Sequence, residues 1–286
     1  MDAKTKLCCL IGNPVEHSLS PMIHNTLAEW LGINLAYTAF RVETEQLEEA
    51  VKGGTALGIL GMNVTVPHKC NVISALKELD PLAEKIGAVN TLVSTEGGYK
   101  GYNTDVIGLK RELSEEGIVI RDAEVIILGA GGAGRAITYL CADMGAKKIY
   151  LLNRNSDKAA ELAEEINASF GPVVTGLGLD EYGKIPKGKY PVIQTTSVGL
   201  YPQVNAAPIT EDAFYELVSA GVDIIFNPAK TEFMKRCEAH GAKTANGLKM
   251  LLYQGIAAFE LWTGARVPQE MADRILVMMA EELAHE

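Results

Sequence analysis

The stretch from Glu124 to Gly134, where an apolar run stops abruptly at a cluster of glycines, most constrains the fold. The run from Val125 to Leu128 predicts a buried strand, and a helical pattern begins at Arg135, directly after the glycines. The glycines have the spacing G-x-G-x-x-G, in which one makes a tight turn, one lets the backbone approach a pyrophosphate, and one allows a helix to pack closely on a strand. Glycine-rich turns also occur where nothing binds. With both flanking elements in place, we predict a dinucleotide-binding turn and an anion site at the helix N-terminus.

The next strand indicates which dinucleotide is bound. A second apolar run covers residues 148–152 and ends in Asn153-Arg154-Asn155-Ser156-Asp157-Lys158. In a NAD site an Asp or Glu about 20 residues past the glycines holds the ribose 2′-hydroxyl, whereas an Arg accommodates a 2′-phosphate. Because this chain has Asn153 and Arg154 there, with Lys158 nearby, we predict an NADP(H) site. The alternative is that Arg154 is an ordinary surface cation at a strand end.

The composition excludes several other classes of protein. The net charge of -10 argues against nucleic acid as a partner. No run approaches the length of a membrane span and the N-terminus lacks a signal-peptide core, so we expect a cytoplasmic protein. The five cysteines have no C-x-x-C spacing, so we expect reduced, buried thiols. The five histidines show no metal-ligand spacing, and we predict no metal site.

Strands and helices alternate along the chain, which predicts an α/β sheet protein. The two C-terminal helices follow the last strand of the nucleotide-binding part, so we expect them to return to the first domain. Predicted strands are 7–11, 36–42, 59–66, 88–94, 99–103, 125–128, 148–152, 173–174, 191–194 and 222–226. Predicted helices are 21–31, 45–52 (closed by two glycines), 72–79, 106–117, 136–144, 158–167, 211–217, 248–263 and 268–283.

Two charged residues stand just past predicted strands, where chemistry could take place. Lys69 follows the strand that contains Asn63, at the edge where ligands of open α/β sheets bind, and Asp105 follows the strand 99–103. A dehydrogenase must move a proton as the hydride leaves, and a Lys paired with an Asp can do this without a metal. The alternatives are a solvated lysine at a helix start and an aspartate that caps the next helix.

The segment from His17 to Pro21 carries two hydroxyls, on Ser18 and Ser20. Extended geometry before the proline would place both on one face, where they could hold a carboxylate. The alternative is structural, with Ser20 as the N-cap of the following helix.

Four amide side chains in apolar surroundings also need hydrogen-bond partners. They are Asn63, Asn90, Asn103 and Gln254. A polyhydroxylated substrate or the neighbouring backbone would supply those partners.

Taken together, six ordered motifs resemble the shikimate dehydrogenase family over nearly the whole chain. The motifs are GNPVEHSLSP (12–21), NVTVPHK (63–69), GAVNT (87–91), NTD (103–105), GAGGAG (129–134) and NRNSDK (153–158). The resemblance implies an α/β fold of two domains, with the active site in the cleft between them. One is an N-terminal α/β substrate-binding domain of residues 1–108 plus 247–286, and the other is a Rossmann-type parallel-sheet NADP domain of residues 109–246. It implies reversible NADP-dependent reduction of 3-dehydroshikimate to shikimate, on the route to aromatic amino acids, by a monomer or homodimer.

The resemblance also implies roles for individual residues. Lys69 and Asp105 would be the catalytic pair, with Lys69 the proton carrier. The residues that would bind substrate are Ser18, Ser20, Thr65, Asn90 and Gln254. The residues that would bind the cofactor are Gly129, Ala130, Gly131, Gly132, Ala133, Gly134, Asn153, Arg154, Lys158, Thr196 and Gly247.

Three positions depart from the family pattern. Phe226 stands where the family usually has Tyr, so a hydroxyl that would reach the substrate is absent. Gln194 replaces a common Asn before a stretch that faces the cofactor, and Lys249 occupies a usually small position near the expected nicotinamide. These departures keep two alternatives open, a quinate/shikimate dehydrogenase of relaxed specificity and a non-catalytic NADP(H)-binding regulator. A folate-type dehydrogenase would fit the cofactor half but not the serine and NTD segments.

Overall fold

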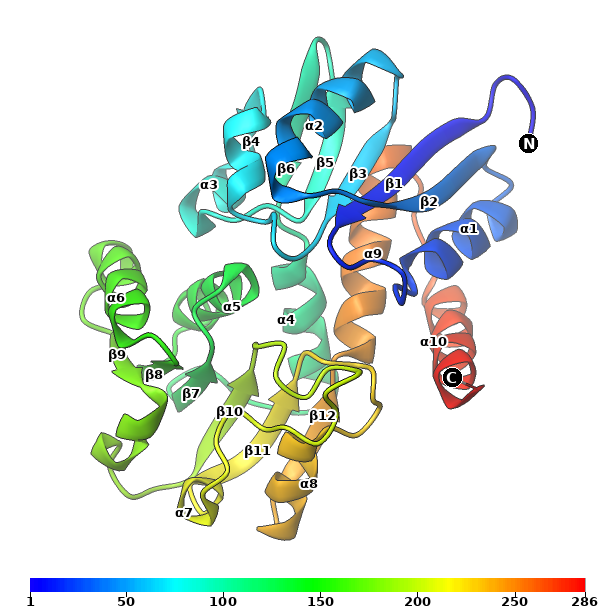
Figure 1. The fold of residues 1–286 in the computed structure, drawn as a ribbon. Coiled ribbons are helices and arrows are strands. Elements are labelled where there is room, and N and C mark those ends of the chain that lie inside the picture. Colours follow the sequence, from blue (N-terminus) through cyan, green and yellow to red (C-terminus); the bar gives the residue numbers. More distant parts are fainter. Residues whose placement is uncertain (286) are drawn as a thin grey trace. The chain divides into compact units, whose positions relative to one another are not determined.

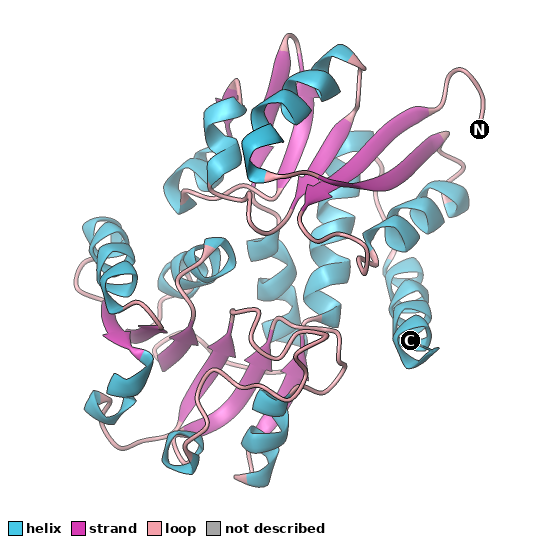
Figure 2. Cartoon of the chain, in the orientation of Figure 1, coloured by secondary structure: helices cyan, strands magenta, loops and turns pink. Residues whose placement is uncertain are grey.

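The structure is a computed structural model that describes residues 1–285, and strands and helices alternate along it (Figures 1 and 2). This alternation confirms the predicted α/β class. The described chain divides into two compact units, one formed by Met1–Gly108 with Leu251–His285 and the other by Leu109–Met250. Each unit contains a six-stranded sheet.

The first unit has a mixed sheet with the strand order β2-β1-β3-β5-β6-β4. Its strands are β1 (Lys6–Gly12), β2 (Leu35–Arg41), β3 (Gly61–Val64), β4 (Glu78–Leu79), β5 (Thr91–Thr95) and β6 (Gly98–Tyr102). Its helical elements are α1 (Ser20–Trp30), η1 (Thr44–Gln46), α2 (Leu47–Ala56), η2 (Asn71–Ala75), α3 (Pro81–Ile86), α10 (Gln269–His285) and the greater part of α9 (Leu248–Thr263). Strands β5 and β6 pair in antiparallel fashion and form a hairpin.

The strand directions of this sheet collect several loops at one edge. Strand β1 is parallel to β3, and both end at that edge, where Ile11 pairs with Val64. Strand β5 is antiparallel to β3 and to β6, so it starts at the same edge at which β6 ends. The segments after β1, after β3, before β5 and after β6 therefore meet, and these segments carry most of the predicted substrate and catalytic residues.

Two helix predictions in the first unit are wrong. Helix α2 does not stop at its two glycines but continues to Ala56. A Cβ on Gly54 would lie 1.8 Å from Met62 Cε, so this glycine allows close packing of the helix on the sheet. The predicted helix 72–79 is a short 3-10 helix followed by β4, because residues 78–79 pair with β6.

The second unit has a fully parallel sheet with the order β12-β11-β10-β7-β8-β9. Its strands are β7 (Glu124–Leu128), β8 (Lys148–Asn153), β9 (Val174–Gly178), β10 (Tyr190–Gln194), β11 (Val218–Asp223) and β12 (Lys243–Asn246). Its helical elements are most of α4 (Asp105–Glu115), α5 (Gly132–Asp143), α6 (Ser156–Phe170), η3 (Leu179–Lys184), α7 (Asp212–Tyr215) and α8 (Glu232–Ala239). Counted from β7, this is the doubly wound order 3-2-1-4-5-6, in which ligands bind outside the carboxyl ends of the strands where the order reverses. That switch point lies between β7 and β10.

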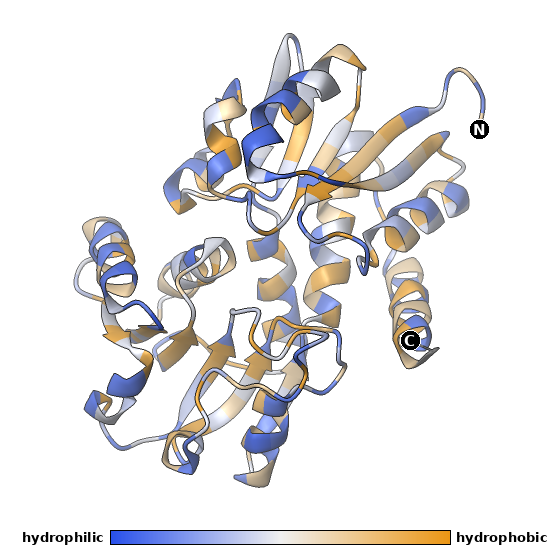
Figure 3. Cartoon of the chain, viewed as in Figure 1, coloured by the Kyte–Doolittle hydropathy of each residue, from blue (hydrophilic) through white to orange (hydrophobic). Residues whose placement is uncertain are grey.

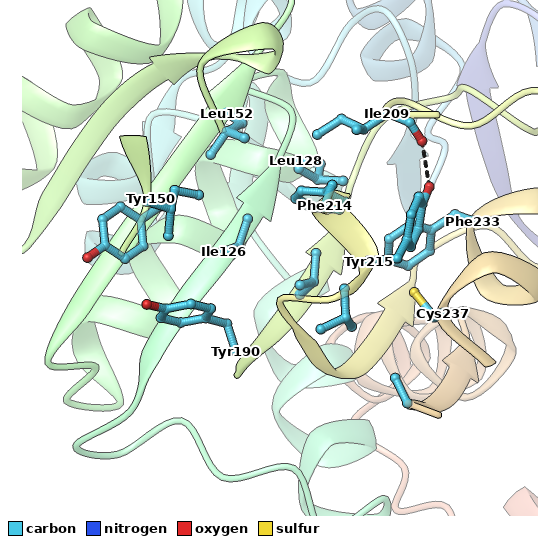
Figure 4. Close-up of a cluster of buried hydrophobic side chains, with 14 of the residues drawn as sticks. Ile126, Leu128, Tyr150, Leu152, Tyr190, Ile209, Phe214, Tyr215, Phe233 and Cys237 are labelled. Atoms are coloured by element: carbon cyan, nitrogen blue, oxygen red, sulfur yellow. Dashed lines mark hydrogen bonds between the residues drawn. The ribbon is translucent and has the colours of Figure 1, made fainter. Parts of the chain in front are cut away.

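The second unit is built around buried strands and an aromatic cluster. Hydrophobic residues run along β7, as its colour in Figure 3 shows, and all of its residues from Val125 to Leu128 are buried. Phe214, Tyr215 and Phe233 pack in the same core as Leu128 (Figure 4). The buried Tyr215 hydroxyl donates to the Ile209 carbonyl at 2.6 Å, which satisfies the polar end of the ring.

Apart from the 3-10 helix η3, which was not predicted, the order of elements in this unit is as predicted up to β10, and the following segment differs. The predicted strand 222–226 is β11 at Val218–Asp223, and the predicted helix 211–217 has only four residues. The sequence reading missed α8 and β12. Strand β11 contains Ser219 and Gly221, so it has no continuous apolar run, and its position is set by pairing with β10 and β12.

All five cysteines are free thiols, and four of them are buried. The buried ones are Cys8, Cys9, Cys141 and Cys237. Cys70 is exposed, so the prediction that all five are buried is wrong for this residue.

Candidate active site

The predicted catalytic residues form an ion pair at the loop-bearing edge of the first unit. Lys69 lies in the turn after β3, and Asp105 is the first residue of α4. Lys69 Nζ is 2.7 Å from Asp105 Oδ2, and the two side chains are 15% and 5% exposed. The carboxylate lies in the first turn of α4, where a negative charge interacts favourably with the helix N-terminus. The ammonium is thus held by a buried carboxylate while the lysine side chain stays partly exposed, an arrangement suited to proton transfer.

Asn90 connects this ion pair to the C-terminal helix α9. Its Nδ2 lies 2.9 Å from Asp105 Oδ1 and 3.2 Å from Gln254 Oε1. Its Oδ1 accepts a hydrogen bond from the Thr104 backbone N–H at 2.7 Å, which fixes the orientation of the amide. Lys69, Asp105, Asn90 and Gln254 therefore form one cluster, although Gln254 is 164 residues away from Asn90 in the chain.

The other two buried asparagines find partners within the protein. Asn63 Oδ1 accepts from the Tyr37 hydroxyl at 2.7 Å, and its Nδ2 donates to Thr91 Oγ1 at 3.1 Å. Asn103 Nδ2 donates to the Ala88 carbonyl at 3.0 Å, while its buried Oδ1 has no partner within residues 1–285. Neighbouring groups thus satisfy Asn63 without a substrate.

The local geometry predicted for the two serines is wrong. Leu19 between them has helical dihedrals (φ −79°, ψ −4°), and the Ser20 N–H donates to Ser18 Oγ at 3.2 Å. This hydrogen bond closes a local turn, which competes with extended backbone. The N-cap of α1 is Leu19, so Ser20 is not the cap either. Ser18 is half-buried and Ser20 is 4% exposed.

Thr65 lies beside the end of β1 in the same unit. Its backbone N–H donates to the Ile11 carbonyl at 3.0 Å, and a Cβ on Gly12 would lie 2.2 Å from Thr65 Cγ2. Only glycine fits at position 12, so the chain after β1 starts directly against Thr65. The roles of the serines and Thr65 in substrate binding stay predictions.

The glycine loop of the second unit has the geometry that its spacing predicts. Gly129 has a positive φ of 110°, and a Cβ on Gly134 would lie 2.0 Å from the Gly129 carbonyl oxygen. These two glycines allow the turn and the close approach of α5. Around Gly131, the N-cap of α5, a Cβ would meet nothing within 4 Å. That open space and the unpaired N–H groups of the first helical turn fit a pyrophosphate.

The last residue of β8 and the residues that follow it carry the side chains predicted to bind the ribose end of the cofactor. Asn153 Oδ1 accepts from the Ala130 N–H at 3.2 Å, so the strand end is tied to the glycine loop. The Asn155 side chain caps α6 by accepting from the N–H groups of Asp157 and Lys158. Arg154 and Lys158 are exposed at this helix start. A neutral Asn153 beside two exposed cations suits a 2′-phosphate better than a 2′-hydroxyl.

Gln194 organises the loop after β10 that contains Thr196. Its Nε2 lies 3.2 Å from the Thr196 and Val198 carbonyls and 3.3 Å from Asp223 Oδ1. Burial raises the pKa of Asp223 to about 6, against the opposing hydrogen bond from Thr231. A Cβ on Gly129 would lie 2.8 Å from Thr196 Cγ2, so this loop packs against the glycine turn. Gln194, although it departs from the family pattern, therefore still anchors this loop through its hydrogen bonds.

The other two departures have different surroundings. Lys249 Nζ lies 2.5 Å from Glu116 Oε1 and 3.5 Å from Glu115 Oε2, at the acidic end of α4. These ion pairs, led by Glu116, raise the pKa of Lys249. Phe226 follows β11 and is half-buried. Gly247, predicted to contact the cofactor, also has a structural reason to be glycine, because a Cβ there would lie 2.0 Å from the Ile224 carbonyl oxygen.

Two buried ionisable residues were missed by the sequence reading. Glu112 is 1% exposed, and its Oε2 accepts from the Met250 N–H at 3.0 Å in the first turn of α9. Burial raises its pKa to about 8. His24 is fully buried with its ring 4.2 Å from the Tyr37 ring, and burial lowers its pKa to about 3. Neither residue belongs to a motif, and only their burial marks them.

Within residues 1–285, no group of three or more His, Cys, Asp or Glu residues could hold a metal ion. No helix in that part of the chain is both long and apolar enough to cross a membrane.

Three family models match the chain. Residues 10–92 match the shikimate dehydrogenase substrate binding domain, residues 112–175 match shikimate/quinate 5-dehydrogenase, and residues 247–270 match the shikimate 5′-dehydrogenase C-terminal domain.

Individual proteins match over nearly the whole length. A shikimate dehydrogenase (NADP+) from Methanopyrus kandleri is 43% identical over 275 residues, which are 95% of this chain and 94% of that protein. A crystal structure of a shikimate dehydrogenase in complex with NADP+ has 40% identity and a TM-score of 0.87, covering 98% of this chain and 97% of that one. The Thermus thermophilus enzyme in complex with NADP(H) and shikimate has 32% identity and a TM-score of 0.82, covering 96% and 99%.

Proposed function

Because the chain belongs to the shikimate dehydrogenase family, we propose that it catalyses the reversible NADP-dependent reduction of 3-dehydroshikimate to shikimate. It is thus an oxidoreductase of aromatic amino acid biosynthesis. The observation that carries the proposal is the ion pair of Lys69 and the buried Asp105, with 2.7 Å between Nζ and Oδ2, which is connected to Asn90 and Gln254.

The two units divide the work. The first, Met1–Gly108 with Leu251–His285, binds the substrate, and the second, Leu109–Met250, binds NADP. The support is that the polar side-chain cluster belongs entirely to the first unit, whereas the glycine loop and the exposed cation Arg154 belong to the second.

Lys69 and Asp105 carry out the proton transfer. NADPH, which the glycine loop and Arg154 would hold, would supply the hydride for reduction of the C3 carbonyl of 3-dehydroshikimate. Lys69 donates a proton to the carbonyl oxygen as the hydroxyl forms, and in the oxidation direction its amine takes the proton back. Asp105 orients the Lys69 side chain through the ion pair between Oδ2 and Nζ.

The remaining candidates bind and orient the substrate. Asn90, Gln254 and Thr65 hydrogen-bond the ring hydroxyls, and Ser18 with Ser20 holds the carboxylate. Support for the first two is their place in the cluster around Asp105. For the serines it is a short turn that keeps their backbones adjacent. Correct orientation of the carbonyl toward the ammonium is itself a large part of such a rate enhancement.

Phe226 favours a second candidate function, a quinate/shikimate dehydrogenase of relaxed specificity. Without the hydroxyl of a tyrosine at this position, the site loses one polar group that would discriminate between hydroxylated ring acids. A non-catalytic NADP(H)-binding regulator is less well supported, because the ion pair of Lys69 and Asp105 is intact. A monomeric or homodimeric state and a cytoplasmic location stay predictions.

Turnover of shikimate by the purified protein tests the proposal directly. We expect NADPH to form from NADP+ and shikimate, seen as absorbance at the nicotinamide band, with a smaller kcat/KM for quinate and for NAD+. Equal or faster turnover of quinate would assign the second function. Tight binding of NADPH with no turnover of either acid would point to the regulator.

A further inference from the structure

A row of buried polar side chains runs behind the candidate catalytic pair and ends at Tyr37. The Tyr37 hydroxyl donates to Asn63 Oδ1 at 2.7 Å, and Asn63 Nδ2 donates to Thr91 Oγ1 at 3.1 Å. Thr91 Oγ1 donates to Asn90 Oδ1 at 3.1 Å, and Asn90 Nδ2 donates to Asp105 Oδ1 at 2.9 Å. Four hydrogen bonds thus join Tyr37 to the carboxylate that holds Lys69.

The row crosses the sheet of the first unit. Tyr37 lies on β2 and Asn63 on β3, with β1 between these two strands. Thr91 begins β5 on the other side of β3. Tyr37 and Asn63 are each 4% exposed, and Thr91 is fully buried. Because no water reaches these groups easily, a donor or acceptor that loses its partner cannot readily be resolvated.

The hydrogen bonds of this row all run in one direction. The phenol of Tyr37 has a single proton, and Asn63 Oδ1 accepts it, which turns the Asn63 NH2 group toward Thr91. The one proton of Thr91 can then go to Asn90 Oδ1, where it adds to the hydrogen bond from the Thr104 N–H and helps to hold the Asn90 NH2 group toward the Asp105 carboxylate. A reversed Asn90 amide would bring its oxygen against that carboxylate, so the direction matters for the ion pair.

The surroundings of Tyr37 keep its phenol a donor. Burial raises the pKa of Tyr37 well above its usual value. The titratable groups nearest to it are His24, whose pKa burial lowers to about 3, and Cys8 and Cys9, whose pKa values burial raises to about 12. All three are neutral at physiological pH.

We propose that Tyr37 is a positioning residue for the reaction, which acts through Asn63, Thr91 and Asn90 to hold the Asp105 carboxylate and Lys69 ammonium in their productive geometry. The inference rests on the proposed function, because the groups it positions are the proton-transfer pair. Tyr37 itself touches neither of them.

Replacing Tyr37 by Phe removes only the hydroxyl that starts the row. We expect the Tyr37→Phe variant to stay folded and to lose roughly tenfold in kcat for shikimate oxidation, a loss of the size expected when one buried hydrogen bond no longer orders the next. The loss should be larger in kcat than the change in KM for NADP+, because the cofactor residues belong to the other unit.

Tyr99→Phe is the matched control. Tyr99 is also a buried tyrosine of the first unit, 1% exposed, and its hydroxyl donates to the Ile59 carbonyl at 2.8 Å. That hydrogen bond has no connection to Asn63 or Asn90. Both variants lose one buried hydroxyl, so they should lose similar thermal stability, but Tyr99→Phe should keep kcat within about twofold of the parent. If kcat in Tyr37→Phe is no lower than in Tyr99→Phe, with both shown to be folded by circular dichroism, the inference is wrong.

A double-mutant cycle with Thr91→Val tests whether the residues act in series. If Tyr37 acts through Thr91, the double variant should lose little more kcat than the more impaired single variant. Losses of kcat that multiply would show that the two residues act independently, which contradicts the row.

The reactivity of the Lys69 amine gives a readout that needs no turnover. Cyanate carbamylates free amines, and mass spectrometry of peptides measures its rate at Lys69 in the presence of the other lysines. A loosened ion pair should make Lys69 of Tyr37→Phe react at least about twofold faster than in Tyr99→Phe. If the parent protein has no activity but Lys69 still reacts faster in Tyr37→Phe than in Tyr99→Phe, only the proposed function is contradicted. If the parent protein is active but Tyr37→Phe changes neither kcat nor the reactivity of Lys69, only the inference is contradicted.

Discussion

In the first unit the candidate groups are side chains that form hydrogen bonds and an ion pair with one another. In the second unit most of them are backbone groups at glycines, which have no side chain to cover them. The Lys69 ammonium is held by its ion pair with Asp105, and the Asp105 carboxylate by a hydrogen bond from Asn90. The geometry of the cluster therefore depends on several residues together. The glycine loop of the second unit depends on the absence of a Cβ atom, in particular at Gly131 and Gly134. The first site should therefore be sensitive to the removal of atoms, and the second to their addition.

The largest effect should follow from removing an amine in the first unit. We expect Lys69→Ala to lower kcat by about 10²- to 10⁴-fold, the usual contribution of a general acid or base. The fold and the affinity for NADPH should be retained, as measured by circular dichroism and by NADPH fluorescence. Lys85→Ala, at an exposed lysine of α3 in the same unit, is the control. Full activity of Lys69→Ala would exclude the assigned role.

Adding one methyl group to the glycine loop should separate stability from cofactor binding. At Gly131 a Cβ meets nothing and φ is −83°, so Gly131→Ala should keep or slightly raise the unfolding temperature. The methyl group would occupy the space that we propose for the pyrophosphate, so NADPH affinity should fall roughly tenfold or more. At Gly134 the added atom would lie 2.0 Å from a carbonyl oxygen, so Gly134→Ala should lower stability by about 1–3 kcal/mol. Unchanged NADPH affinity in Gly131→Ala would refute the assignment of this loop.

A smaller change should follow from the cation beside Asn153. We expect Arg154→Gln to weaken NADP+ binding about tenfold and to leave NAD+ binding nearly unchanged, because only NADP+ carries the 2′-phosphate. The ratio of kcat/KM for the two cofactors measures this effect. An equal loss with both cofactors would mean that Arg154 does not recognise the phosphate.

The smallest effect concerns the two buried ionisable groups, which respond to pH in opposite directions. The folded pKa of Glu112, about 8, lies above its usual value of 4.5, so its protonated form stabilises the fold at low pH and this stability is lost as pH rises through 8. The folded pKa of His24, about 3, lies below 6.5, so its contribution is present above pH 6.5 and is lost as pH falls toward 3.

Between pH 6.5 and 8, of these two residues, Glu112 should therefore make the larger contribution to the pH dependence of the free energy of unfolding. We expect the free energy of unfolding to fall by about 2 kcal/mol over this window in the parent protein, and by much less in Glu112→Gln, whose amide can still accept from the Met250 N–H. Urea denaturation at several pH values measures it, with Glu161→Gln, at an exposed position of α6, as the control. Parallel curves for Glu112→Gln and the parent would contradict the raised pKa.

Local signals accounted for most of what was predicted correctly. The apolar run, the glycines and the next apolar run are consecutive in the chain, so β7, α5 and β8 could be placed from short stretches. Helix α3 also has local signals, since Asp80 caps it, Pro81 opens it and Gly87 closes it in a left-handed conformation. Helix α3 could therefore have been predicted from the sequence, although it is not among the predicted helices.

Other features depend on residues far apart in the chain. Residues 78–79 form a strand only because β6 lies next to them. The turn at Ser18 has a backbone hydrogen bond from the Ser18 N–H to the Val15 carbonyl and a side-chain hydrogen bond from the Ser20 N–H to Ser18 Oγ, neither of which extended geometry before a proline would suggest. The buried positions of His24 and Glu112 follow from the packing of several elements, and no spacing in the sequence encodes them.

The sequence by itself determined the α/β class and the choice of NADP, and it identified the glycine loop, Lys69 and Asp105 as candidates, because alternating apolar runs and short ordered motifs are local features of the chain. Only the tertiary structure decided that Lys69 and Asp105 form an ion pair, that Asn90 and Gln254 join them, and that Tyr37 is connected to them through the sheet. The physical reason is that hydrogen bonds of about 3 Å between different strands and helices depend on the register and packing of the whole unit. A linear pattern of residues does not contain that register.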